Sequence, residues 1–167
     1  DFPPKPSTNG HAGHLPNQSS HAKTPANHAQ TLEISKLRAK ITARWQSAIP
    51  DKGRIADYLT YRGLDLSHAN LNGVPPSLKL IESLEYFDAD PANPKQQILA
   101  GHYPAMAAMV HHPSLGIVAM HRTYLSATEN DHGKAPVKAA KKLSTPIYQG
   151  ATSGAAIRLY PATGETL

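Results

Sequence analysis

Two neighbouring strand-type segments constrain the fold of this chain most strongly. Residues 103–111 and 116–125 are mainly apolar, and His112-Pro113-Ser114-Leu115 joins them. A short connection that contains proline favours a turn, so the sequence predicts a β-hairpin.

Alternation along the second segment divides its side chains between two faces. One face carries Val118, Met120, Arg122 and Tyr124, and the other carries Ile117, Ala119, His121, Thr123 and Leu125. Because both faces mix apolar and polar residues, we expect one face to be covered and the other to present chemistry.

Two helices are predicted ahead of the hairpin. Ile34, Leu37, Ile41 and Trp45 recur at helical spacing, with Thr31 as the expected N-cap and an end before Pro50. Beside this apolar stripe lies a basic one, formed by Lys36, Lys40 and Arg44. Such a stripe is usually the solvent-exposed face of a helix. A shorter helix is expected from about Gly53 to Arg62, with Gly63 as a left-handed C-cap residue and Leu64 as the apolar contact after it.

The remaining sequence favours short strands. Residues 78–87, 142–147 and 155–160 are of strand type, whereas residues 88–95 are rich in turn formers. The predicted fold class is therefore α+β, with N-terminal helices at about 31–72 followed by a small, mainly antiparallel β-sheet at about 77–160.

Residues 1–30 differ in composition from the rest. They are rich in proline and polar residues and contain little that is large and apolar, so we expect a disordered linker or tail. The spacing of His14, His21 and His28 is even, but in a flexible chain it fixes no metal geometry. The chain begins without Met, which favours a fragment of a longer protein.

Charge points to an anionic partner. The 167 residues carry a formal net charge of +5. From Lys134 to Arg158 the chain contains no acid, and its cations are Lys134, Lys138, Lys141, Lys142 and Arg158. These residues could converge on phosphate, although a solvated basic face gives the same composition.

Several classes of protein are disfavoured by what the sequence lacks. Without cysteine there is no disulfide, thiol nucleophile or Cys-based zinc site. No apolar run approaches the length of about 18 residues that spans a bilayer, so a cytoplasmic protein without membrane association is expected.

The common catalytic motifs are also missing. Gly150-Ala151-Thr152-Ser153-Gly154 has neither the Gly-Lys-Ser/Thr ending of a phosphate-binding loop nor the Gly-x-Ser-x-Gly elbow of a hydrolase. Asp88 and Asp90 have the spacing of magnesium ligands but no third acid nearby. We therefore expect no catalytic residue and no metal site in this chain.

Three groups of motifs resemble the region just before the Toprim domain of bacterial-type DNA primases and primase-helicases of phages, plasmids and integrative elements. The first group is Ala43-Arg44-Trp45-Gln46-Ser47-Ala48-Ile49-Pro50 with Tyr58-Leu59-x-x-Arg62-Gly63-Leu64. The second is Tyr103-Pro104-Ala105-Met106 with His121-Arg122-Thr123-Tyr124-Leu125. The third is Lys134-Ala135, Lys141-Lys142-Leu143 and Gly154-Ala155-Ala156-Ile157-Arg158-Leu159.

The resemblance implies that residues 31–167 form the N-terminal subdomain of a primase RNA-polymerase domain. It would bind single-stranded DNA template or nucleotides during replication of a mobile genetic element. The implied binding residues are His121, Arg122, Lys134, Lys141, Lys142 and Arg158. The nucleotidyltransferase activity and its Mg²⁺ ligands would reside in the Toprim domain of the same polypeptide, without which this part is inactive and needs no cofactor.

An alternative from a different class is a protein-interaction module. Trp45, Tyr58 and Tyr61, together with the basic helix, would then dock onto a helicase or another replication partner. Helical spacing favours Trp45 and Tyr58 as core residues, which counts against this alternative.

Overall fold

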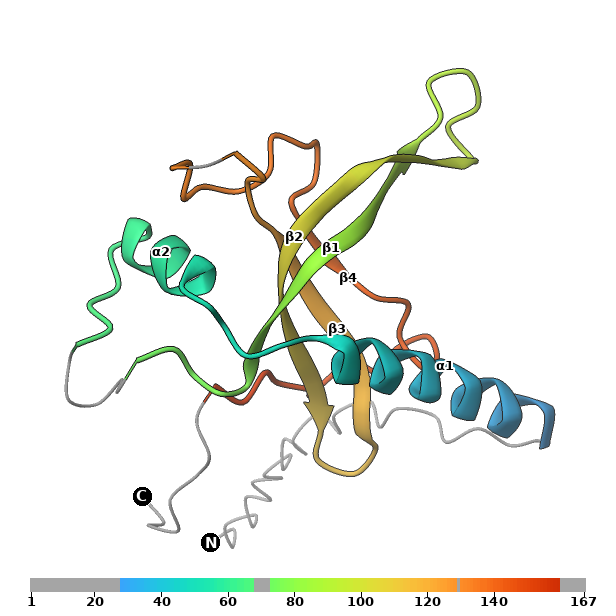
Figure 1. The fold of residues 1–167 in the computed structure, drawn as a ribbon. Helices are drawn as coiled ribbons and strands as arrows, with labels where there is room; N and C mark the ends of the chain where they lie inside the picture. Colours follow the sequence, from blue (N-terminus) through green and yellow to red (C-terminus); the bar gives the residue numbers. More distant parts are fainter. Residues whose placement is uncertain (1–27, 68–72, 129, 160–167) are drawn as a thin grey trace, which may run out of the picture.

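The computed structural model describes residues 28–67, 73–128 and 130–159, and these residues form an α+β fold, as predicted (Figure 1). Two helices come first, α1 (His28–Ser47) and α2 (Arg54–Tyr61). Four strands follow, β1 (Leu78–Ala89), β2 (Gln97–His112), β3 (Gly116–Tyr124) and β4 (Lys141–Leu143). They form one antiparallel sheet in the order β1-β2-β3-β4. None of the described helices is long and apolar enough to cross a membrane.

The predicted hairpin is present as β2 and β3, with Met109 opposite Met120 in the ladder. Beyond β4 the strand prediction for residues 142–147 is only partly met. Strand geometry ends at Leu143, yet the Ile147 amide still donates to the Val118 carbonyl at 3.0 Å. The strand expected at residues 155–160 is wrong over its described part, where Ala156 forms only an isolated bridge with His111, and residue 160 lies outside the described residues.

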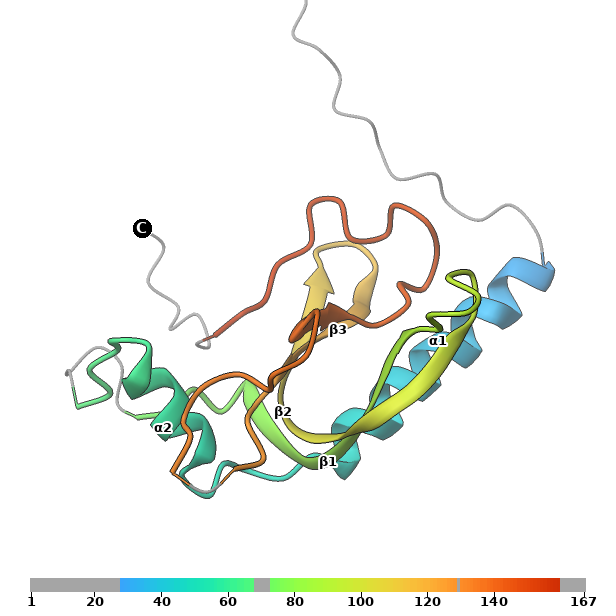
Figure 2. The ribbon, with the colours of Figure 1, turned by 90° about the horizontal axis from the view of Figure 1, so that it is seen from above.

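The sheet is strongly curved, and α1 packs on its concave face (Figure 2). Register shifts between Ile81 and Leu84, and again between Tyr86 and Phe87, bend β1 against β2. The bend brings the ring of Tyr86 to 5.1 Å from that of Tyr124, edge to face, and the Tyr124 hydroxyl donates to the Glu85 carbonyl at 2.8 Å. Side chains of α1 join the same core, where Ile41 is 5% exposed.

The opposite face of the sheet carries α2. Ile55 and Tyr58 of this helix are buried with Leu80, Ala108 and Leu125. The expectation that one face of β3 is covered while the other presents chemistry is partly met. Val118 and Ala119 lie on opposite faces of the strand and are both fully buried, whereas His121 and Arg122 near its end are half-buried.

The predicted start of α1 is wrong, whereas the predicted end of α2 is confirmed. Helix α1 begins at His28, so Thr31 is not its N-cap and the helix extends into the segment predicted as a linker, of which residues 1–27 lie outside the described residues. The C-cap prediction for α2 is confirmed. Gly63 has φ 86°, and the amides of Gly63 and Leu64 donate to the carbonyls of Thr60 and Leu59, the Schellman pattern. Leu64 itself stays 45% exposed.

Candidate functional site

A basic pocket lies between α1 and the β3–β4 edge of the sheet and encloses about 130 Å³. Its polar lining residues are Lys40 and Arg44 from α1, Arg122 from β3, and Ser144 and Thr145 from the segment after β4. Leu37, Ile41 and Met120 supply apolar wall. The helical spacing that keeps Lys40 and Arg44 on one side of α1 places both beside the strand that carries Arg122.

Arg122 is held in the pocket by a hydrogen bond to the neighbouring strand, and part of its hydrogen-bonding capacity is unused. Its Nη2 donates to the Leu143 carbonyl at 3.3 Å, whereas its buried Nε has no hydrogen-bond partner. Burial lowers the pKa of the Arg122 guanidinium, and the positive charge of Arg44 acts in the same direction against the opposing effect of Tyr124. An anion in the pocket would offset the positive charge of Arg122 and Arg44.

The pocket has more positive than negative charge. Arg44 lies 3.6 Å from the Glu85 carboxylate. For Lys40 and Arg122, no described carboxylate lies within ion-pair distance. Three cations therefore share one acid at the rim. This arrangement suits a phosphate group, which an arginine can grip with its planar fork of donors.

The structure places only Arg122, among the six residues predicted to bind nucleic acid or nucleotide, in this pocket. Lys142 lies opposite Arg122 in the ladder, but its Nζ donates to the Phe87 carbonyl and sits 3.9 Å from the centre of the Tyr86 ring. Lys142 therefore helps to hold the curved sheet together.

The other predicted binding residues lie elsewhere. His121 and Lys141 share the opposite face of the sheet, where burial first, and then the charges of Lys141 and Arg122, lower the pKa of His121. Lys134 is exposed and bridges Leu125 through its backbone. Arg158 lines a separate, mainly apolar hollow beside Trp45 and His111. The predicted cations are thus divided among several places.

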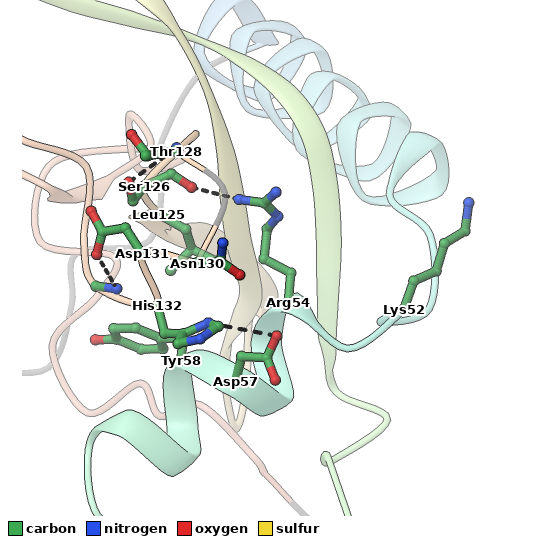
Figure 3. A pocket seen from close by; sticks show the side chains of 11 residues that line it. Lys52, Arg54, Asp57, Tyr58, Leu125, Ser126, Thr128, Asn130, Asp131 and His132 are labelled. Atoms are coloured by element: carbon green, nitrogen blue, oxygen red, sulfur yellow. Dashed lines mark hydrogen bonds and ion pairs between the residues drawn. The ribbon is translucent and has the colours of Figure 1, made fainter.

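A second, polar cavity of about 290 Å³ lies between the start of α2 and the loop after β3 (Figure 3). Its lining includes Arg54, Asp57 and Tyr58 from α2, and Ser126, Asn130, Asp131 and His132 from the loop. Arg54 Nη1 donates to the Ser126 carbonyl at 2.5 Å, and His132 Nδ1 lies 3.7 Å from Asp57 Oδ2.

The sequence indicated Arg122 and the basic stripe with Lys40 and Arg44, but it did not indicate the polar cavity. The spacing of Lys40 and Arg44 was visible, but helical spacing alone does not distinguish a ligand-facing stripe from a solvated one. Arg54 and Ser126 are 72 positions apart, and no motif links them. Within the described residues, no three or more His, Asp or Glu side chains are grouped so that they could hold a metal ion.

Comparison with known proteins gives one match. A model of the family described as Domain of unknown function (DUF7146) matches residues 35–154. The chain belongs to this family. No curated protein and no solved structure matches it. The DUF7146 match spans all the lining residues of both cavities, whereas Arg158 lies outside it.

Proposed function

We propose that this DUF7146 chain is the template- or nucleotide-binding subdomain of a DNA primase, and that its basic pocket holds a phosphate group of that ligand. The observation that carries the proposal is Arg122, a partly buried guanidinium with an unpaired Nε, placed beside Arg44 and Lys40. The motifs that resemble the region before a Toprim domain supply the reaction, whose metal-binding carboxylates would belong to the Toprim domain of the same polypeptide.

The residues of the basic pocket divide the work of holding phosphate. Arg122 offers guanidinium N–H groups other than the buried Nε to a phosphate oxygen, while Arg44 and Lys40 contribute charge from α1. The Ser144 hydroxyl is already engaged, because it accepts from the Met120 amide at 2.9 Å. Thr145, which is exposed at the pocket, provides a hydroxyl that can donate to the ligand.

Fewer observations support the alternative, a docking module that uses aromatic residues. Tyr58 is 5% exposed, and Trp45 packs against the core with Lys79 Nζ 4.8 Å from its ring centre. Of the three aromatic residues, Tyr61 alone is widely exposed, at 67%. A single exposed tyrosine offers a small anchor for a protein partner.

The test is binding of a fluorescent single-stranded oligonucleotide, followed by anisotropy over a series of salt concentrations. We expect affinity to fall with salt with a log–log slope of about −0.7 per phosphate contact. Arg122→Met and Lys40→Ala should each weaken binding about tenfold at low salt and flatten the slope, because each removes charge from the pocket. Lys36→Ala is the matched control on the same helix, since Lys36 is exposed and paired with Glu33 at 2.8 Å.

Circular dichroism and urea unfolding of each variant establish that it is folded. Arg122→Met should keep the stability of the parent protein, because the removed guanidinium has an unsatisfied buried nitrogen. Two results contradict the proposal: a folded parent protein that does not bind the oligonucleotide at low salt, or a loss of affinity in Lys36→Ala as large as that in Lys40→Ala.

A further inference from the structure

The polar cavity in Figure 3 contains an arginine without an acidic partner. Arg54 is partly buried and uses Nη1 to bind the Ser126 carbonyl. None of the described carboxylates lies within ion-pair distance of it, although Asp57 and Asp131 line the same cavity. A guanidinium has five N–H donors, so Arg54 has donors available for acceptors on a ligand.

The two carboxylates of the cavity differ in their availability. Asp131 is engaged in a turn of the loop, because it accepts from the Gly133 amide at 2.9 Å. Hydrogen bonds from Ser126 first, and then from Gly133, lower its pKa. Asp57 is 57% exposed, and its one ion-pair contact in the described structure is His132, at 3.7 Å. Asp57 therefore offers carboxylate oxygens to donors on a ligand.

The chemistry of these walls restricts what the cavity can bind. Arg54 can bind acceptors on a ligand, and Asp57 can bind donors. The nearly balanced charge of the cavity disfavours a free phosphate, for which the basic pocket is better suited. The half-exposed ring of His132 lines the cavity as well and favours a planar ligand.

We propose that the polar cavity binds an unpaired guanine base, with Arg54 donating to its acceptors O6 and N7 and Asp57 accepting from its donors N1–H and N2–H. Arginine pairs with the O6 and N7 edge of guanine, and unpaired bases expose their remaining edge to side chains. Among the common bases, guanine offers two acceptors on one edge and two adjacent donors on the next. The inference rests on the proposed function only for the source of the base, a template strand or a nucleotide.

The experiment titrates the protein with guanosine, which carries no phosphate, and follows amide chemical shifts by nuclear magnetic resonance. Adenosine, cytidine and uridine are titrated in parallel. We expect guanosine to bind about tenfold more tightly than the other nucleosides, and Arg54→Gln and Asp57→Asn each to lower its affinity about tenfold. Lys36→Gln and Asp65→Asn remove one charge each from exposed positions outside the cavity and should leave guanosine affinity unchanged.

Arg54→Lys guards against a structural explanation. Lysine can still donate to the Ser126 carbonyl, so the fold should hold, but it lacks the planar fork and guanosine affinity should fall as in Arg54→Gln. Equal affinity for the four nucleosides, unchanged guanosine binding in the Asp57 variant, or absence of saturable binding to the folded protein would overturn the proposal. Because the basic pocket is tested with Arg122→Met and an oligonucleotide, failure of one site is distinguishable from failure of the other.

Discussion

At the scale of single residues, neighbouring positions on β3 have opposite environments. Arg122 faces the basic pocket, where burial and the charge of Arg44 both act against its own charge. His121 lies on the other face of the strand beside Lys141. Both side chains lie next to positive charge, and no described carboxylate lies within ion-pair distance of either, which is the environment expected where an anion completes a site.

His121 should make stability depend on pH. Burial, followed by the charges of Lys141 and Arg122, holds its folded-state pKa below the ordinary value of 6.5. The unfolded chain therefore binds a proton more readily than the folded protein, and folding stability rises with pH in this range. The contribution of His121 is complete above pH 6.5 and is lost as the pH falls below that value, through the lower folded-state pKa.

The measurement is the melting temperature between about pH 7.5 and pH 5 for the parent protein and His121→Gln. We expect the decrease on acidification to be smaller in His121→Gln. His102→Gln, at an exposed position of β2, is the control and should retain the decrease of the parent protein. An equal decrease in the parent and His121→Gln would exclude His121 as its source.

At the scale of elements, α2 depends on its caps because it has only eight residues. At its start, Asp51 accepts from the Ile55 amide at 2.8 Å and from the Ala56 amide at 3.0 Å. At its end, the Schellman pattern around Gly63 satisfies two carbonyls. Such a short helix has little stability of its own, so capping and packing on the sheet fix the position of Arg54 and Asp57.

Loss of the N-terminal cap should be measurable. Asp51→Ala removes the acceptor of two helix amides and should lower the free energy of unfolding by about 1 kcal/mol in urea titrations. Glu82→Ala is the control, because it removes an exposed acid whose contact with Lys52, at 3.5 Å, is worth less than about 0.5 kcal/mol. Equal losses in the two variants would show that the cap contributes no more than a surface ion pair.

At the scale of the whole molecule, one sheet carries two apolar clusters on its two faces. Helix α1 belongs to one cluster and α2 to the other, and β1 and β2 contribute side chains to both. Because the same strands support both layers, loss of packing on one face should destabilise the other face as well.

Leu59→Ala tests this coupling. Leu59 of α2 is 9% exposed, so its truncation should cost about 2 to 4 kcal/mol. Trp45, the only tryptophan of the chain, lies in the α1 layer and reports on that layer by fluorescence. We expect the fluorescence midpoint in urea to shift by as much as the circular dichroism midpoint. A fluorescence midpoint equal to that of the parent would mean that the layers unfold independently.

The sequence by itself determined the two helices, the central hairpin and the faces on which their side chains lie. Periodicity identified both helices, and alternation placed Arg122 and Tyr124 on the same face of the predicted hairpin. Gly63 marked the end of α2 because a left-handed residue strongly favours glycine. The prediction of Thr31 as the N-cap was wrong, because a threonine before an apolar stripe is compatible with a cap and with the interior of a longer helix.

The tertiary structure alone decided which residues share a site. Arg44 meets Arg122 because α1 packs on the concave face of the sheet, and Arg54 meets Ser126 because α2 packs on the other face. Local pattern reports the direction of a side chain relative to its own element, within a few residues. The docking of one element on another is set by the burial of whole apolar surfaces, to which these polar residues contribute little. The sequence around each polar residue therefore does not indicate which distant residue it contacts.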